Sequence, residues 1–318
     1  MKRAAALVCA AVASTVYLLT PSQTAQPAQD ERPVRLEHRA QAERNAQSAR
    51  SAPSERPVQA HRSAPPRHRA QSDGSAAGAR ATAPGLAAPA QKELAQQIVA
   101  SAENGTLDWR SAYGYVEDIG DGQGYTAGLI GFCTGTHDLL ALVEGYTRAH
   151  PDNALAPYLP ALRRVDGSDS HEGLDPGFPD AWRAESRVPA FRAAQDAERD
   201  RVYFDPAVRR GRADGLGALG QFIYYDALVF HGPGTGPTSF DGIRARATRQ
   251  ARTPAQGGGE AAYLGAFLDA RRRAMLIRHP GVDTSRVDTT QRRFLREGNL
   301  DLRPPLRWQV YGETFQVP

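Results

Sequence analysis

Cysteine is nearly absent from this chain, which has only Cys9 and Cys133 among its 318 residues. A fold held together by several disulfide bonds is therefore excluded. Long hydrophobic runs are also scarce: the apolar run at 4–19 is shorter than the roughly 20 residues that a membrane-spanning helix needs, and no later segment replaces it. The sequence predicts no integral membrane protein.

Residues 1–25 have the layout of a secretory signal peptide, with Lys2 and Arg3 before the apolar run and small or polar residues after it. A membrane anchor is the alternative, and the short run favours removal. We therefore expect a secreted, extracellular protein with no membrane attachment once the leader is gone. Its removal would leave Cys133 alone, without an intramolecular disulfide.

Residues 26–90 are poor in aromatic and β-branched side chains and rich in Ala, Pro, Gln, Ser and Arg. Such a segment cannot bury enough apolar surface to offset its chain entropy, so we predict a disordered tether or pro-segment. Its ten arginines outnumber its six acidic residues, and a basic cell-wall tether is the second interpretation. Residues 91–318 are long enough for a sizeable core and form the predicted catalytic domain.

The positive charge of the chain lies outside that domain. Of 39 basic and 35 acidic residues, the leader and tether hold 12 and 6, which leaves 27 and 29, a net charge of −2. The basic pI of the whole chain is thus no argument for nucleic-acid binding by the domain. A mildly acidic domain instead suits a cationic ligand.

The domain is predicted to be mainly helical, with a small β element in its first third. Aromatic residues at short intervals and a glycine-dense segment indicate a hairpin within 107–132. A helix is expected to begin near Thr136 as its N-cap and to end before Pro151. The other helices are expected at 92–103, 189–201, 215–230, 260–277 and 284–295.

Two predicted helices carry charges on their apolar stripes. Asp226 lies on or beside the stripe of 215–230, and Arg271 lies within that of 260–277. A buried carboxylate and a buried guanidinium each cost several kcal/mol unless they are paired, so we expect the two to meet. At this stage a structural salt bridge and a functional network are equally good interpretations.

Two carboxylates are candidates for acid and base chemistry. Glu103 ends a helix near Trp109, in surroundings that can keep a carboxyl protonated as a proton donor. Asp121 lies between glycines that leave room for a water and a sugar ring, and Thr126 offers a hydroxyl to orient that water. A glycine-rich turn with aspartates is more often only a turn.

Other site types find little support. Gly120 and Gly122 occupy the alternate positions at which a calcium loop needs oxygen ligands, so no metal site is predicted. Cys133 is interpreted as a small buried cysteine rather than a nucleophile. His231 opens a glycine-proline loop and is either a loop cap or a sugar contact.

Several ordered motifs resemble those of glycoside hydrolase family 46 chitosanases of the actinomycete type, over essentially 92–318. They are Ser101-Ala-Glu-Asn, Leu107-Asp-Trp, Glu117-Asp-Ile-Gly-Asp-Gly-Gln-Gly-Tyr-Thr, Gly131-Phe-Cys-Thr-Gly-Thr, Glu198-Arg-Asp-Arg-Val-Tyr-Phe-Asp-Pro, Ala218-Leu-Gly-Gln-Phe, His231-Gly-Pro-Gly, Ala251-Arg-Thr-Pro-Ala-Gln and Gly298-Asn-Leu-Asp-Leu. The resemblance implies an α+β fold of two helical lobes around a substrate cleft, with a small sheet, distantly similar to lysozyme.

The resemblance also implies an inverting endo-acting hydrolase of β-1,4 glucosamine linkages in chitosan. Glu103 would be the general acid and Asp121 the general base, with Thr126 holding the attacking water; their carboxyl groups should lie roughly 6.5 to 9.5 Å apart. Asp226, Arg271 and Arg286 would form a charge network reaching Glu103. On this basis an Arg286→Ala variant is expected to lose most activity and to keep its fold largely intact.

Family substrate contacts match six further residues: Tyr115, Ile130, Gly131, Thr136, Asp138 and His231. Gln123 stands where relatives commonly have arginine, and the wall at 277–283 is less acidic than in some relatives. We expect chitosan as the ligand, no nucleic-acid partner, no metal or other cofactor, and a monomer. The alternatives are a hydrolase of chitin or peptidoglycan and a wall-binding protein without turnover.

Overall fold

The computed structural model describes residues 85–120 and 122–318. The predicted signal peptide, most of the predicted tether and Asp121 lie outside these residues. Leu86 is fully buried and helix α2 begins at Pro89. Residues 85–90, assigned to the tether from their composition, therefore belong to the folded part. Within the described ranges, no helix is long and apolar enough to cross a membrane.

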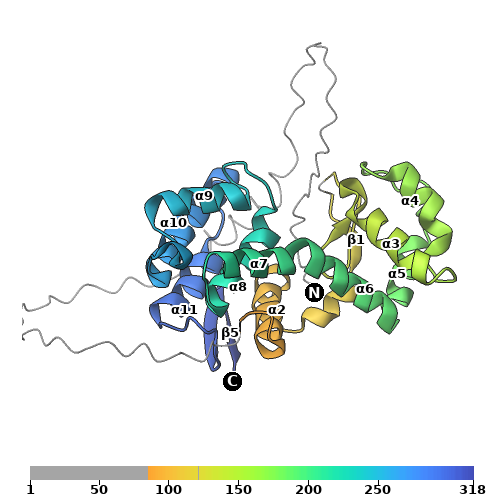
Figure 1. Cartoon of the computed structure of the whole chain (residues 1–318). Coiled ribbons are helices and arrows are strands. Elements are labelled where there is room, and N and C mark those ends of the chain that lie inside the picture. Colours follow the sequence, from red (N-terminus) through yellow and green to blue (C-terminus); the bar gives the residue numbers. More distant parts are fainter. Residues whose placement is uncertain (1–84, 121) are drawn as a thin grey trace, which may run out of the picture.

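The described chain forms two lobes with separate hydrophobic cores, which lie on opposite sides of Figure 1. The sheet lobe, here residues 105–200, contains an antiparallel sheet in the order β1-β2-β3. Its strands are β1 (Val116–Asp118), β2 (Tyr125–Ala127) and β3 (Phe132–Cys133). The hairpin predicted within 107–132 is therefore present.

Short helices cover the sheet and enclose the core of this lobe. Phe132, Leu139, Phe178 and Trp182 are each fully buried within it. The helices are η1 (Trp109–Gly114), η2 (Thr134–Thr136), α3 (Asp138–Ala149), η3 (Ala156–Tyr158), α4 (Leu159–Val165), α5 (Phe178–Glu185) and α6 (Pro189–Arg199).

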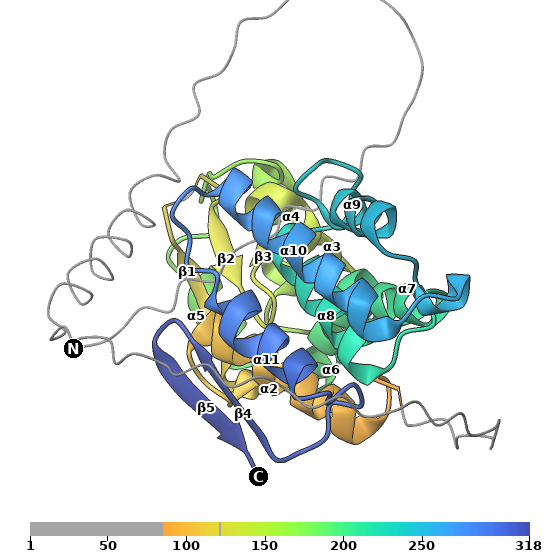
Figure 2. The same cartoon turned by 90° about the vertical axis from the view of Figure 1, so that its left-hand side faces the viewer.

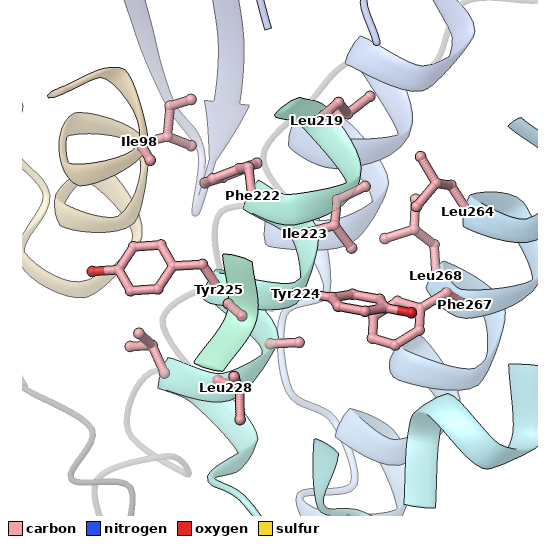
Figure 3. Close-up of a cluster of buried hydrophobic side chains, with 14 of the residues drawn as sticks. Ile98, Leu219, Phe222, Ile223, Tyr224, Tyr225, Leu228, Leu264, Phe267 and Leu268 are labelled. Carbon is pink, nitrogen blue, oxygen red and sulfur yellow. The ribbon is translucent and has the colours of Figure 1, made fainter. Parts of the chain in front are cut away.

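The helical lobe comprises residues 85–104 and 201–318. Its centre is α8 (Ala218–His231), in which every residue is buried. Figure 3 shows Phe222 and Tyr225 on the side of α8 that faces Ile98, and Ile223 and Tyr224 toward the helix that carries Leu264 and Phe267. The surrounding elements are α2 (Pro89–Asn104), α7 (Asp205–Ala213), α9 (Phe240–Gln250), η5 (Pro254–Gln256), α10 (Glu260–Arg278), η6 (Arg286–Gln291), α11 (Arg292–Arg296), β4 (Leu306–Val310) and β5 (Glu313–Val317).

The lobes are joined by a continuous helical segment. α6 runs through a π-helical turn, η4 (Asp200–Phe204), into α7, and this segment crosses the middle of Figure 1. A third, small core cluster includes Trp109 and Leu129, and Ile130 packs against all three clusters. The cores of both lobes thus meet near the end of α2.

The predicted helices are all present, with shifted ends. The helix expected to begin at Thr136 begins at Asp138, because the chain enters it through His137 in a left-handed conformation. Thr136 lies in the preceding 3-10 turn, so its predicted N-cap role is wrong. The C-terminal β4–β5 hairpin was not predicted, although alternate β4 residues are buried; in Figure 2 it lies below α10 and α11.

Candidate active site

Glu103 lies in the last turn of α2, and Gly105 ends that helix in the left-handed conformation expected of an Asn-Gly stop. Its Oε1 lies 2.6 Å from Nη1 of Arg286, and the carboxylate side chain is 9% exposed. Arg286 comes from η6, far along the sequence. A nearly buried ion pair therefore fixes the predicted general acid to the helical lobe.

Asp226 of α8 holds Arg286 in turn. Arg286 donates to Oδ1 of Asp226 through Nε at 2.9 Å and through Nη2 at 2.6 Å. Arg271 of α10 donates to Oδ2 from Nη1 at 2.5 Å. Asp226 and Arg271, which were expected to pair from their positions on two helices, do form an ion pair. Arg286 connects this pair to Glu103. We call Asp226, Arg271 and Arg286 the buried charge network.

The buried charge network has almost no contact with solvent, so the charges within it strongly affect one another's pKa values. Burial alone would raise the pKa of Asp226, but Arg286 and Arg271 outweigh it and lower that pKa to about 2. Burial lowers the pKa of Arg286, but the charges of Asp226 and Glu103 more than offset this and raise it well above its ordinary value. One aspartate and two arginines sum to +1, so an ionised Glu103 makes the group of four neutral.

A small cavity of about 30 Å³ adjoins the Glu103 side chain, lined on one side by Trp109, Leu129 and Ile130. Two buried amide atoms border it, Nε2 of Gln96 and Oδ1 of Asn104, and neither has a hydrogen-bond partner among the described residues. The Gln96 carbonyl accepts a hydrogen bond from the Tyr225 hydroxyl at 2.9 Å. Glu103 therefore has a charged contact and an amide-lined cavity around its carboxylate.

The predicted base, Asp121, lies outside the described residues. Its neighbours Gly120 and Gly122 have φ of 73° and 80°, and a Cβ added to either would meet nothing within 4 Å. They lie in the turn between β1 and β2, which ends at the register pair of Asp118 and Tyr125. Both glycines that flank Asp121 in the sequence therefore have open space around them.

Thr126 is fully buried in β2, and its Oγ1 lies 3.3 Å from the Cys133 sulfur. The Cys133 sulfur also lies 3.3 Å from the Gly131 carbonyl oxygen. Thr126 and Gly131 are therefore brought together around β2 and β3.

Asp138 begins α3, where it holds the turn after β3. Its Oδ1 accepts hydrogen bonds from the Cys133 amide at 2.8 Å and the Thr136 hydroxyl at 2.7 Å. Burial raises the pKa of Asp138, although these hydrogen bonds oppose the shift. Asp138 and Thr136, both predicted substrate contacts, thus form one hydrogen-bonded unit.

The remaining predicted contacts lie on different elements. Tyr115 is half-buried, and its hydroxyl donates to Glu117 at 3.4 Å. His231 ends α8 and is only 4% exposed. Burial and the nearby charges of Arg271 and Arg278 lower the pKa of His231 well below its ordinary value. A neutral imidazole therefore lies near the charge network.

The known proteins most useful for comparison are all chitosanases. The sequence profile of glycosyl hydrolase family 46 matches residues 97–306. The chain is 59% identical to a chitosanase of Streptomyces sp. (strain N174), and the match covers 73% of this chain and 84% of the relative. It is 55% identical to a chitosanase of Nocardioides sp. (strain N106), and that match covers 75% of this chain and 85% of the relative. The chain belongs to glycosyl hydrolase family 46.

A solved structure agrees with this family 46 assignment. The co-crystal structure of chitosanase OU01 with substrate matches with a TM-score of 0.70 and 55% identity, over 74% of this chain and all of that one. The predicted mainly helical α+β architecture is confirmed, and the chain is a glycoside hydrolase.

Two residues of this family 46 site were missed from the sequence. Gln291 donates to Oδ2 of Asp226 at 2.6 Å and accepts from Arg271 at 2.9 Å. The sequence contained a signal for Gln291: it follows Val287 by four residues and precedes Phe294 by three, a helical spacing that places it on the same buried face. Tyr311 lies in the unpredicted β4–β5 turn and gave no such signal; the residue is exposed, but Glu103 and Arg286 are close enough to influence the pKa of its hydroxyl.

Proposed function

We propose that this family 46 protein is a secreted, endo-acting chitosanase that hydrolyses β-1,4 linkages between glucosamine units with inversion at the anomeric carbon. The observation that carries the proposal is the nearly buried ion pair of Glu103 with Arg286. A carboxylate held so firmly at the end of a helix is positioned for chemistry, and a relative with 55% identity was crystallised with its substrate.

In the proposed reaction Glu103 donates its proton to the leaving glycosidic oxygen as the bond to the anomeric carbon breaks. Asp121 takes a proton from a water that attacks the opposite face of the sugar, and Thr126 helps to orient that water. One proton is given and one is taken in each turnover. Both carboxyls must therefore exchange protons with solvent before the next cycle.

The buried charge network constrains the acid step. A guanidinium beside a carboxylate favours its ionised form, whereas a general acid must begin protonated. We infer that the contact between Glu103 and Arg286 loosens when the substrate is bound, while Asp226 keeps Arg286 in place through three hydrogen bonds. The cavity beside Glu103 gives its carboxyl group space to move.

Substrate binding is assigned mainly to the sheet lobe. Asp138 provides a carboxylate for a glucosamine ammonium, and its hydrogen bonds to Thr136 and to the Cys133 amide set its orientation. Tyr115 offers a half-buried ring and hydroxyl, while Ile130 lines the cavity beside Glu103 and Gly131 directly follows it in the chain. His231 contributes from the helical lobe. We further propose that the protein acts as a monomer outside the cell, after loss of residues 1–25.

The proposal is tested by sugar release from soluble chitosan and from chitin. We expect the wild-type enzyme to cut chitosan far faster, and Glu103→Gln to lower the rate about 10² to 10⁴-fold because the proton donor is gone. Glu144→Gln is the matched control, since Glu144 is a surface partner of Arg163 on α3. Equal rates on both polymers would point to another substrate, and near wild-type activity of Glu103→Gln would remove Glu103 as the acid.

A further inference from the structure

The Gln96 side chain on α2 is buried, but only one end of its amide is paired. The residue is 5% exposed, and the residues next to it in the main core are apolar. Its Nε2 has no hydrogen-bond partner among the described residues. A buried donor without a partner destabilises a fold, and an apolar side chain of the same size would avoid this cost. The N–H group of Gln96 is therefore a candidate for a role in function.

Tyr225 of α8 holds the Gln96 amide in one orientation. Figure 3 shows Tyr225 on the side of α8 that faces α2, and its hydroxyl donates to Oε1 of Gln96 at 2.9 Å. Burial raises the pKa of Tyr225 to about 12, so its hydroxyl keeps its proton and remains a donor. Because Oε1 accepts this hydrogen bond, Nε2 is the end of the Gln96 amide that is left for another partner.

The cavity beside Glu103 lies along the same face of α2 as Gln96. The helix residues that line it include Gln96, Val99, Ala100 and Glu103, at the spacing of one helix face. Gln96 and Glu103 are thus two turns apart, with only apolar side chains between them. The cavity of about 30 Å³ has room for about one or two oxygen atoms and is far too small for a sugar ring.

Gln96 and Asn104 give this cavity one free donor and one free acceptor. Oδ1 of Asn104, the residue after Glu103, is buried and has no hydrogen-bond partner within the described ranges. A protonated carboxyl group has one acceptor oxygen and one O–H donor, whereas a carboxylate has only acceptors. The two amides therefore suit the protonated form of Glu103, whereas its ion pair with Arg286 suits the ionised form.

We propose that Gln96 is a positioning residue for the general acid and holds the protonated carboxyl group of Glu103 in the cavity between turnovers. The inference rests on the proposed role of Glu103 as the acid. In this position Nε2 of Gln96 donates to the carboxyl C=O, and the carboxyl O–H donates to Oδ1 of Asn104. When the substrate is bound, the O–H group exchanges Asn104 for the glycosidic oxygen. Gln96 acts only through Glu103 and does not contact the sugar.

Several charged and titratable groups surround Glu103 and the cavity. They are Arg286 of η6, Asp226 and Tyr225 of α8, Arg271 of α10, Arg199 of α6, Tyr203 of η4, Tyr311 and Asp283 beside η6, and Glu313 of β5. Arg199 donates to Asp196 at 2.8 Å and to Asp200 at 2.9 Å. Burial raises the pKa of Tyr203, so its hydroxyl stays neutral. Arg286, which forms an ion pair with Glu103, is therefore the group that competes with the cavity for this side chain.

Loss of the Gln96 donor should favour the ionised acid. Without Nε2, the C=O of protonated Glu103 has no partner in the cavity, whereas the ionised form keeps its ion pair with Arg286. The protonated fraction of the acid then falls at a lower pH. We therefore expect the basic limb of the profile of kcat against pH to move to lower pH, with little change in KM.

The test compares Gln96→Met with Gln221→Met in the full chain, assayed on a soluble chitosan oligomer over a range of pH. Methionine keeps the length of the side chain and removes the amide. Gln221 is the matched control because it is 3% exposed and both ends of its amide are paired. Its Oε1 accepts from the Leu86 amide at 3.0 Å, and its Nε2 donates to the Leu216 carbonyl at 2.8 Å.

We expect Gln96→Met to move the basic limb down by about one pH unit, so that kcat on that side falls about tenfold while KM stays within about twofold. Gln221→Met should unfold at a lower urea concentration than wild type and keep the wild-type limb. A wild-type limb in Gln96→Met, or the same shift in Gln221→Met, would overturn the proposal.

Tyr225→Phe provides a second variant in case Gln96→Met does not fold. It removes the hydroxyl that orients the Gln96 amide and should move the limb in the same direction by a smaller amount; an unchanged limb would count against the proposal. Wild type and Glu103→Gln are assayed in the same series. If wild type did not cut chitosan, or if Glu103→Gln kept its activity, the proposed function would fail, and this failure is distinct from a wild-type limb in Gln96→Met.

Discussion

The two lobes deploy charge in opposite ways. In the sheet lobe most charges lie at surfaces and turns, as where His171 lies 3.1 Å from Asp118 at the base of the glycine turn, although Glu185 and Arg199 are buried. In the helical lobe, Asp226, Arg271 and Arg286 are enclosed by the main core. The proposed acid is thus held from a buried interior, whereas the two glycines that flank the proposed base in the sequence lie in an open turn. The proposed acid step therefore depends on buried ion pairs, whereas the proposed base step depends on the conformation of a glycine turn.

Removing Arg286 should have the largest effect. Arg286→Ala leaves Glu103 without its ion pair and removes three hydrogen bonds from Asp226, so we expect a stability loss of about 3 to 5 kcal/mol. We expect a loss of activity of about 10²-fold or more, because the acid is no longer held in place. The variant is still expected to keep its fold largely intact, at this lower stability. Urea unfolding and chitosan turnover are the measurements.

Two companion variants sharpen that test. Arg286→Lys keeps the charge but cannot make the same set of contacts, and should recover part of the stability and little of the activity. Arg292→Ala removes only surface ion pairs with Asp269 and Asp288, and should cost less than about 1 kcal/mol. If Arg286→Ala were as stable and active as Arg292→Ala, the buried network would have no role in holding the acid.

Acid should weaken the helical lobe through Asp226. Its pKa of about 2 in the fold lies below the ordinary 3.8, so its contribution to stability is complete above about pH 4 and is lost as the pH falls through about 2. The difference corresponds to about 2 kcal/mol. Unfolding free energies of wild type and Asp226→Asn between pH 7 and pH 2 test this. Wild type should lose about 2 kcal/mol more than the variant in this window, and parallel curves would contradict the shift.

A smaller loss of stability than at Arg286 or Asp226 is expected at the glycines beside Asp121. Gly122→Ala adds a Cβ at a φ of 80° with nothing within 4 Å, so only backbone strain of about 1 to 2 kcal/mol is expected. Activity should fall more than stability does, because the shifted backbone carries Asp121. Gly257→Ala is the control in the helical lobe, with a φ of 82° and equally open space. Comparable activity in the two variants would show that the turn does not position the base.

Local patterns predicted the parts of this structure that depend on local rules. The 3.6-residue spacing and the Asn-Gly stop placed Glu103 at a helix end, and charges on apolar stripes placed Asp226 against Arg271. Thr136 was misassigned because a left-handed His137 and the Asp138 side chain, rather than a threonine cap, begin α3. The contact of Arg286 with Glu103 joins segments 183 residues apart, so no local spacing could reveal it, and only the resemblance to a family did.

The most direct test of the proposed inverting mechanism is the stereochemistry of cleavage. A chitosan oligomer is incubated with the enzyme in an NMR tube, and the anomeric proton of the new reducing end is followed from the first scans, before mutarotation. We expect the α-anomer to appear first from the β linkage. The reason is that the water activated by Asp121 attacks the face of the sugar opposite the glycosidic oxygen that Glu103 protonates. Initial release of the β-anomer would contradict it.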